Sequence, residues 1–276
     1  MKTWKYSLSS ADKAPSSAPI LLRGSICDNL IKASRLGYNA IEVHTREDVY
    51  LDYEKIKKTI QETGIRISMI ITGRLNTEGR CNLMDDAPYI TEAAMNGVRK
   101  YIEMAELLGA DIVIGWVKGN VPANGNREFY MERLAKNIRI LAGYGIQHNV
   151  RLNLEVINRY EVNLFTTALE TLQFINKYQL QNCYVHLDTF HMFIDEENPF
   201  EAILACKDRL GYLHLADNSR RYPGSSNIDF SQVLHNLEII NYNGYLSVEC
   251  FPIPDGETAA TRALEHMKKC EKSMCL

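Results

Sequence analysis

Residues 90–117, "ITEAAMNGVRKYIEMAELLGADIVIGWV", contain a helical pattern and a strand pattern that are separated by a glycine. The first 21 residues place apolar side chains at i, i+3, i+4 and i+7, which indicates an amphipathic helix. The run "DIVIGWV" (111–117) is apolar and rich in β-branched residues, which favours a buried strand. Gly109 follows the last helical turn, where glycine commonly ends a helix. The stretch therefore predicts a helix–turn–strand unit.

The same unit recurs along the chain, as in "RLGYNAIEV" and "ETGIRISMI", and a second long helical pattern covers 126–149. Strands alternating with helices imply parallel pairing through right-handed crossovers. Eight units in 276 residues predict an α/β protein, a (β/α)8 TIM barrel that forms a single domain over 1–276. An open doubly wound sheet is the competing architecture, but the glycine-rich phosphate-binding motifs typical of it are absent. The predicted strands are 4–9, 40–44, 66–71, 111–117, 151–156, 183–188, 211–216 and 245–250.

The amino-acid composition restricts the kinds of partner that the protein can bind and the cellular compartment in which it works. With 31 basic and 34 acidic residues, the chain has no excess of positive charge for gripping nucleic acid. No apolar run approaches the roughly 18 residues of a membrane span, and the amino terminus lacks the pattern of a signal peptide. The seven cysteines are scattered, without a C-x-x-C motif, which argues against a disulfide framework. We therefore expect a cytoplasmic protein without nucleic-acid or membrane partners.

Each of the last four predicted strands carries one acidic or histidine side chain at or next to its carboxyl end. The residues are separated by about one strand–helix unit each, so four adjacent barrel strands would bring them to one point. Alternation along each strand also agrees, because in "RLNLE" (151–155) the side chains of Asn153 and Glu155 share one face while Leu152 and Leu154 share the other. The four residues are Glu155, Asp188, His214 and Glu249.

Three carboxylates and one imidazole are mostly hard ligands, which suit Mn²⁺ or Mg²⁺ and tolerate Co²⁺. A sugar that chelates such an ion through adjacent oxygens would have its carbonyl polarised. The enediolate formed by loss of the neighbouring proton would then be stabilised by the positive charge. The pattern therefore predicts a metal site that acts on a ketose or hydroxyketone.

Other polar residues have less specific interpretations. His186 lies on the inward face of the same strand as Asp188, one layer of side chains below it. It is expected to be a hydrogen-bonded core histidine. Trp116 either floors a sugar pocket or packs in the barrel. Lys118 and Arg74 are candidates for meeting an anionic substrate group, although isolated basic loop residues seldom have so specific a role. His44 is expected to be structural or at the surface.

At four motifs the chain resembles the xylose-isomerase-like sugar isomerase/epimerase superfamily, and within it the D-tagatose/D-allulose 3-epimerase group. The resemblance in strand order and helix pattern covers nearly the whole chain, while the specific motifs lie in about the last 130 residues. The motifs are "LEVINRYE" (154–161), "LDTFHM" (187–192), "HLADNSRRYPG" (214–224) and "SVECFP" (247–252).

The resemblance implies one divalent ion, usually Mn²⁺ or Co²⁺, bound by Glu155, Asp188, His214 and Glu249. It also implies that Glu155 and Glu249 form an acid/base pair on opposite faces of the substrate. One glutamate would remove the proton from the carbon next to the ketone, and the other would return a proton on the far side, which inverts that centre. The expected enzyme is a ketose 3-epimerase-like sugar epimerase, an isomerase of class EC 5.1.3 that acts in carbohydrate metabolism.

By the same resemblance, Glu161, His191 and Arg220 bind the substrate around its C1 to C3 oxygens, and the protein forms a homodimer or homotetramer. One motif departs from the pattern. Tagatose and allulose epimerases commonly carry H-x-G-E-x-N-R where this chain has "HLADNSR" (214–220), a form closer to a branch that includes epimerases of keto-hexonates such as 5-keto-L-gluconate. A keto-sugar acid therefore stays open as a substrate beside a neutral ketose.

Three other functions fit parts of the pattern. An aldose–ketose isomerase uses the same metal and fold, and only the position of the substrate over the metal separates it from an epimerase. An endonuclease of the apurinic-site type needs a multi-zinc cluster, for which Glu42 and His44 are the only hint, and a basic DNA-binding face. A non-catalytic sugar-binding barrel would not need two carboxylates that face each other across the ligand.

Overall fold

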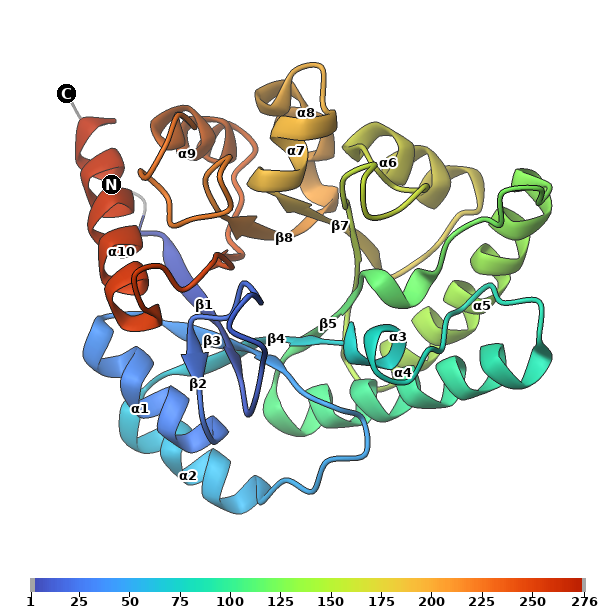
Figure 1. Cartoon of the computed structure of the whole chain (residues 1–276), viewed down its shortest axis with the longest axis horizontal. Coiled ribbons are helices and arrows are strands. Elements are labelled where there is room, and N and C mark those ends of the chain that lie inside the picture. Colours follow the sequence, from blue (N-terminus) through green and yellow to red (C-terminus); the bar gives the residue numbers. More distant parts are fainter. Residues whose placement is uncertain (1–2, 275–276) are drawn as a thin grey trace.

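The computed structural model describes residues 3–274, and its strands close into a parallel barrel surrounded by helices (Figure 1). Within these residues, eight strands pair with their sequence neighbours, and pairing between the first and the last closes the ring. The fold class is therefore confirmed. The expected domain limits, 1 and 276, lie outside the described residues, so the domain assignment stays a prediction. The barrel strands are β1 (Lys5–Ala11), β3 (Ala40–His44), β4 (Arg66–Ile71), β5 (Asp111–Ile114), β6 (Leu152–Glu155), β7 (Cys183–Asp188), β8 (Leu210–Leu215) and β9 (Tyr245–Val248).

Helices follow the barrel strands and form the outer ring (Figure 1). A short strand, β2 (Leu22–Arg23), pairs with β1 and was not predicted. Two single-turn 3-10 helices, η1 (Trp116–Lys118) and η2 (Lys207–Arg209), interrupt the connections. The helices are α1 (Ile26–Leu36), α2 (Tyr53–Thr63), α3 (Arg74–Thr77), α4 (Pro88–Leu108), α5 (Arg127–Gln147), α6 (Ala168–Lys177), α7 (Thr189–Asp195), α8 (Pro199–Cys206), α9 (Phe230–Ile239) and α10 (Gly256–Ser273).

The helix–glycine–strand unit forms as its sequence predicts. Helix α4 ends at Leu108, and Gly109 adopts the left-handed conformation at φ 67°. Its amide donates to the carbonyls of Ala105 and Glu106, which satisfies backbone groups that the helix end leaves open. Strand β5 then begins at Asp111, two residues later. Local sequence thus sets where the helix stops and the strand begins.

Strand β5 is shorter than predicted, because it ends at Ile114 and the chain turns into η1 rather than continuing to Val117. Gly115 lies at the turn, and a Cβ atom there would lie 2.3 Å from Oε2 of Glu155. A strand residue with a side chain would collide with that carboxylate. The glycine therefore lets the backbone pass close to the end of β6.

Side chains along each barrel strand point alternately to the surrounding helices and into the barrel. On β3, Ile41 and Val43 belong to the main apolar core, while the intervening Glu42 is fully buried inside the barrel. A smaller apolar cluster, in which Met69 and Val113 take part, comes from the inner positions of β4, β5 and β8. The inside of the barrel therefore holds both this apolar cluster and buried polar groups such as Glu42.

Candidate active site

The four strand-end residues meet at the carboxyl end of the barrel, and we call them the strand-end cluster. Glu155 and Asp188 are the last residues of β6 and β7, His214 lies one residue before the end of β8, and Glu249 follows β9. The register pairs Asp188 directly with His214. All four are at least nine-tenths buried. The local alternation and the parallel register together bring residues 94 positions apart in the sequence to one point.

The imidazole of His214 lies at the centre of the strand-end cluster. Its Nδ1 is 3.6 Å from Oε1 of Glu155, 3.8 Å from Oδ2 of Asp188 and 3.6 Å from Oε2 of Glu249. Among residues 3–274, neither this Nδ1 nor Oδ2 of Asp188 has a hydrogen-bond partner, although both are buried. Two ligands on one divalent ion lie at most about 4.2–4.4 Å apart, since each bond is about 2.0–2.2 Å. The donor atoms therefore fit a divalent ion, and the cluster could hold one.

Asp188 owes its position to helix α7. Its Oδ1 accepts a hydrogen bond of 2.8 Å from the amide of Phe190 and so caps the helix, while Oδ2 faces the cluster. The first turn of α7 then places His191 so that its Nε2 lies 3.6 Å from Oδ2 of Asp188. An aspartate and a histidine three residues apart thus occupy one site because a strand ends and a helix begins between them.

Burial and neighbouring charges separate the pKa values of the two glutamates. Burial acts to raise the pKa of Glu155, but His214 and His186 outweigh it and hold that pKa at about 2. Burial raises the pKa of Glu249 above its usual value, despite the positive charges of His214 and Arg220. The two carboxyls of one site therefore differ in their tendency to hold a proton.

The residues expected to bind substrate form a connected row beside the cluster. Nη2 of Arg220 donates to Oε2 of Glu249 at 2.6 Å, and Nη1 lies 3.0 Å from Nε2 of His191. The side-chain Nδ2 of Asn158 lies 2.7 Å from Nδ1 of His191 and donates to Oε1 of Glu161 at 3.0 Å. Structure thus brings all three expected residues together, and Asn158, which the sequence did not single out, links them.

The loop that carries Arg220 is organised by a buried carboxylate, Asp217. Its two oxygens accept hydrogen bonds from five backbone amides between residues 218 and 228. The backbone of Arg220 has φ 54°, and its carbonyl accepts from the amide of Phe251. These hydrogen bonds hold the loop in one conformation, which places the Arg220 guanidinium next to Glu249.

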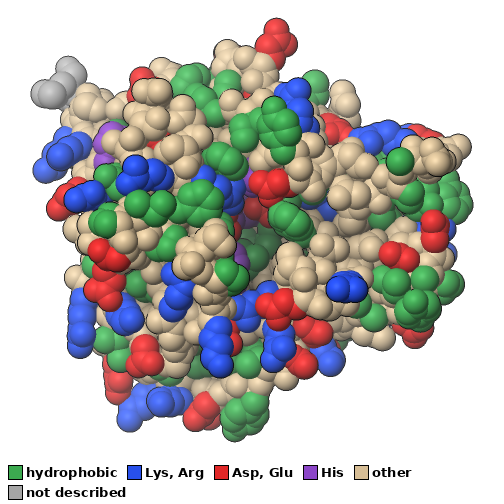
Figure 2. Space-filling view, viewed as in Figure 1, with side chains coloured by type: hydrophobic (Ala, Val, Ile, Leu, Met, Phe, Trp, Pro, Cys, Tyr) green, Lys and Arg blue, Asp and Glu red, His purple; other side chains and the backbone are tan. Residues whose placement is uncertain are grey.

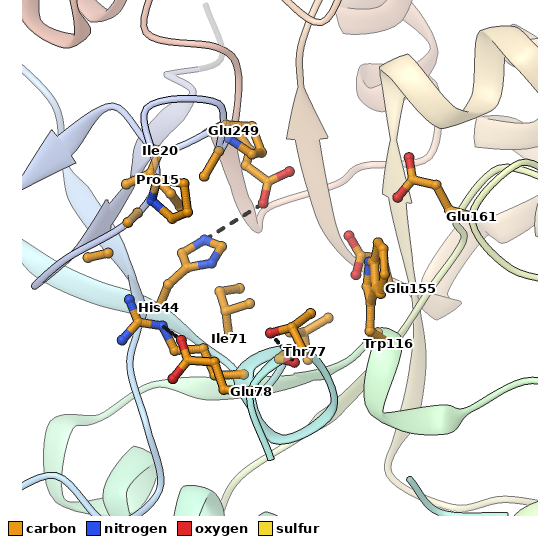
Figure 3. A pocket seen from close by; sticks show the side chains of 18 of the residues that line it. Pro15, Ile20, His44, Ile71, Thr77, Glu78, Trp116, Glu155, Glu161 and Glu249 are labelled. Carbon is orange, nitrogen blue, oxygen red and sulfur yellow. Dashed lines mark hydrogen bonds and ion pairs between the residues drawn. The ribbon is translucent and has the colours of Figure 1, made fainter. Parts of the chain in front are cut away.

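A cavity of about 400 Å³ opens above the cluster, and the hollow is visible in the space-filling view, where acidic and histidine atoms lie in its wall (Figure 2). Glu249 lies on one side of the cavity, and Glu155 and Glu161 lie on the other (Figure 3). Trp116 lines the wall and is 39 % exposed. Trp116 therefore lies at the cavity and is not packed inside the barrel, and it belongs to η1 rather than to a strand, while a role in sugar binding stays a prediction.

The structure also bears on the less specific interpretations of His186, Lys118 and His44, and the hydrogen bonding expected of His186 is wrong. His186 is buried in the core as expected, but within the described part of the chain neither ring nitrogen has a hydrogen-bond partner. Lys118 is not available to a substrate, because it is fully buried and its ammonium donates to the carbonyls of Gly115 and Glu155. His44 lines the cavity, and its Nε2 lies 3.7 Å from Oε1 of Glu249.

Arg74 lies at the rim of the cavity with its charge already compensated. Its guanidinium donates to Oδ1 of Asp12 at 2.8 Å and lies 3.4 Å from Oε1 of Glu78. It also donates to the carbonyl of Lys13. Two carboxylates therefore compete with any anionic substrate group for this cation.

Comparison with known proteins agrees with the geometry. The family model for the xylose isomerase-like TIM barrel matches residues 30–270. An L-ribulose 3-epimerase from Methylomonas sp. (strain DH-1) is 32 % identical over 222 residues, which cover 79 % of this chain and 76 % of that protein. A D-psicose 3-epimerase from Enterocloster bolteae is 28 % identical over 231 residues, covering 82 % and 76 %.

The fold comparison extends over nearly the whole chain. The crystal structure of a D-allulose 3-epimerase from Methylomonas sp. in complex with D-allulose superimposes with a TM-score of 0.80 at 25 % identity, covering 98 % of each chain. Within residues 3–274, no helix combines the length and apolar character needed to cross a bilayer. The expectation of an isomerase-class enzyme is confirmed by these relatives. The chain belongs to the xylose isomerase-like TIM barrel family, within the group of ketose 3-epimerase-like proteins.

Proposed function

We propose that the protein is a metal-dependent epimerase that inverts the carbon next to the ketone of a ketose or keto-sugar acid. The observation that carries the proposal is the pair Glu155 and Glu249, which face each other across the cavity and each lie 3.6 Å from Nδ1 of His214 (Figure 3). Inversion of one carbon requires a proton to leave on one side and return on the other, which two opposed carboxylates supply. Relatives named as ketose 3-epimerases support the choice of C3.

The strand-end cluster is the proposed site of one divalent ion, with Mn²⁺ as the first candidate and Co²⁺ or Mg²⁺ as alternatives. Nδ1 of His214 and Oδ2 of Asp188 lie 3.8 Å apart, and within residues 3–274 neither has a hydrogen-bond partner, which supports this assignment. When bound, such an ion supplies positive charge that polarises a carbonyl and stabilises an enediolate. Three carboxylates beside one imidazole favour these hard ions over zinc.

Different side chains of the protein are proposed to transfer the proton, bind the sugar and exclude water. Glu155 and Glu249 move the proton, one removing it and the other returning it. Arg220, His191 and Glu161 are proposed to bind and orient the sugar oxygens, because they form one hydrogen-bonded row along the cavity. The apolar side of the cavity, which includes Ile71 and Val113, excludes water from the reacting carbon.

Between the two substrate classes, the observations favour a neutral ketose. Lys118 is buried against carbonyls, and Arg74 is paired with two carboxylates, so neither cation is free for a substrate carboxylate. The named substrates of several relatives are also neutral ketoses. A 3-dehydro-D-guloside 4-epimerase from Escherichia coli, 28 % identical over 226 residues, makes a ketoside a third substrate class to test.

The expected assembly and location are proposals as well. We retain a homodimer or homotetramer, which light scattering of the purified protein would measure. The six cysteines within the described residues are free, in agreement with a reducing cytoplasm. Cys275 lies outside the described residues.

The direct test is to incubate the Mn²⁺-loaded protein in D₂O with ketopentoses, ketohexoses, ketosides and keto-hexonates, and to follow products by NMR. The proposal predicts deuterium at C3 of a ketose, or at the carbon α to the ketone of a keto-acid, with the inverted epimer as product. Deuterium only at C1 or C2, with formation of an aldose, would instead identify an aldose–ketose isomerase on the same site. Absence of exchange with every substrate would favour a non-catalytic sugar-binding protein.

A further inference from the structure

Glu42 is a buried carboxylate that the proposed reaction does not use. It lies on the inner face of β3 and is fully buried. Within residues 3–274, its ion-pair partners are the imidazoles of His44 and His214, and no lysine or arginine lies within ion-pair distance. Removing a carboxylate from water is costly unless strong hydrogen bonds compensate. The position of Glu42 is therefore best explained by what it does to these imidazoles.

The contact with His214 fixes the orientation of that ring. Oε2 of Glu42 lies 2.9 Å from Nε2 of His214. An ionised carboxylate only accepts hydrogen bonds, so the hydrogen must lie on Nε2. The opposite nitrogen, Nδ1, then faces Glu155, Asp188 and Glu249. Histidines that bind metals commonly donate their other N–H to a carboxylate in this way.

Glu42 is itself held from below by a chain of hydroxyl groups. The hydroxyl of Tyr212 donates to Oε2 of Glu42 at 3.2 Å and lies 2.7 Å from Oγ of Ser68. Oγ of Ser68 lies 2.7 Å from Oγ of Ser7. The chain crosses the inside of the barrel between β8, β4 and β1 and is buried throughout. The carboxylate therefore has a fixed position instead of several rotamers.

The second oxygen of Glu42 reaches the other side of the cluster through His44. Nε2 of His44 lies 3.3 Å from Oε1 of Glu42 and 3.7 Å from Oε1 of Glu249. Figure 3 shows His44 beside the cavity with its ring directed at Glu249. The carboxylate of Glu42 thus contacts two imidazoles. One is His214, which would bind the ion, and the other is His44, which lies beside the proposed proton-transfer residue Glu249.

We propose that Glu42 is a positioning residue for the divalent ion, acting through His214, and that His44 extends its influence to Glu249. The inference rests on the proposed function only in assuming that the strand-end cluster binds an ion. Loss of Glu42 should therefore weaken ion binding before any sugar is present. This separates Glu42 from residues that act only on the substrate.

Calorimetric titration of the full chain with Mn²⁺, without sugar, measures this effect. Glu42→Gln should raise the dissociation constant about 10- to 100-fold, the range found for residues that hold metal-binding histidines. Glu92→Gln is the matched control, because it makes the same carboxylate-to-amide change at an exposed position on α4, away from Glu42. Its dissociation constant should change by less than about threefold. Equal affinities of wild type and Glu42→Gln would overturn the proposal, whereas a wild type that binds no Mn²⁺ would overturn the proposed metal site instead.

A measurement on the unmodified protein covers the case in which Glu42→Gln fails to fold. Imidazole ¹⁵N NMR of the Mg²⁺-loaded wild type reports which nitrogen of each histidine carries hydrogen. The inference predicts hydrogen on Nε2 of His214, with the proton resonance shifted downfield by the hydrogen bond to Glu42. An Nε2 proton without that shift would contradict the proposed role of Glu42, whereas hydrogen on Nδ1 would contradict the proposed metal site instead.

Discussion

The two halves of the barrel differ at their inner surfaces. Strands β4 and β5 present Met69, Ile71 and Val113, which pack together as an apolar cluster. Strands β6 to β9 present the strand-end cluster at the same end of the barrel. The apolar side chains lower the dielectric constant around the charged side chains. Each electrostatic contact across the cavity is therefore stronger than it would be in water. The asymmetry therefore places the proposed proton-transfer residues in one half and apolar side chains in the other.

The largest effect should come from neutralising a proposed proton-transfer residue in the charged half. Glu155→Gln and Glu249→Gln should each lower turnover about 10²- to 10⁴-fold, because the amide keeps the shape of the side chain but cannot exchange the proton. Steady-state kinetics with saturating Mn²⁺ measures this loss. Glu92→Gln, a change at an exposed position on α4, is the control and should keep the wild-type rate. Full activity of either cluster variant with ion bound would end the acid/base assignment.

The next effect should come from the apolar half and should appear in stability. Met69 is 1 % exposed, and its truncation to alanine leaves a cavity inside the barrel. Met69→Ala should lower the free energy of unfolding by about 2–5 kcal/mol. Met69→Leu, which nearly conserves the volume, should cost less than about 1.5 kcal/mol. Chemical denaturation compares the two, and equal losses would show that packing inside the barrel does not set the cost.

The smallest effect should come from Lys118, the buried cation near the junction of the two halves. Burial lowers its pKa to about 8 from an ordinary value of 10.5. Below pH 8 both folded and unfolded chains carry the charge, and the folded state bears the full desolvation cost. Between pH 8 and 10.5 the unfolded chain binds more protons, so the Lys118 contribution to stability rises with pH.

Lys118→Met removes this contribution and should stabilise the protein at pH 7 by about 1–3 kcal/mol. The difference from wild type should shrink as the pH rises toward 10.5. Denaturation at a series of pH values measures it, with Lys100→Met at an exposed position as the control. A difference that stays constant with pH would show that the substitution acts through packing or lost hydrogen bonds and not through the charge.

Local patterns in the sequence were sufficient for the barrel and for the strand-end cluster. Period-two alternation orients each strand, and one residue per strand–helix unit, at the same height in parallel register, must converge at the barrel mouth. Glu155 and Asp188 could therefore be placed without knowing any long-range contact. The roles of these residues in ion binding and proton transfer stay predictions.

The residues that sequence reasoning missed depend on contacts across the barrel. Glu42 and His44 share the inner face of β3, and this alternation was the available signal, but their partners lie on β8 and after β9. Lys118 was interpreted as a loop cation because no local pattern shows that its ammonium is buried against the carbonyls of Gly115 and Glu155. The missing hydrogen bonds of His186 likewise depend on which side chains surround it, and no local pattern reports that.

Anomalous diffraction from crystals grown with Mn²⁺, recorded at the manganese absorption edge, would locate the proposed ion. We expect one strong peak between Glu155, Asp188, His214 and Glu249, within about 2.0–2.3 Å of a donor atom from each. A peak elsewhere in the barrel, such as between Glu42, His44 and Glu249, or no peak at all, would contradict this expectation.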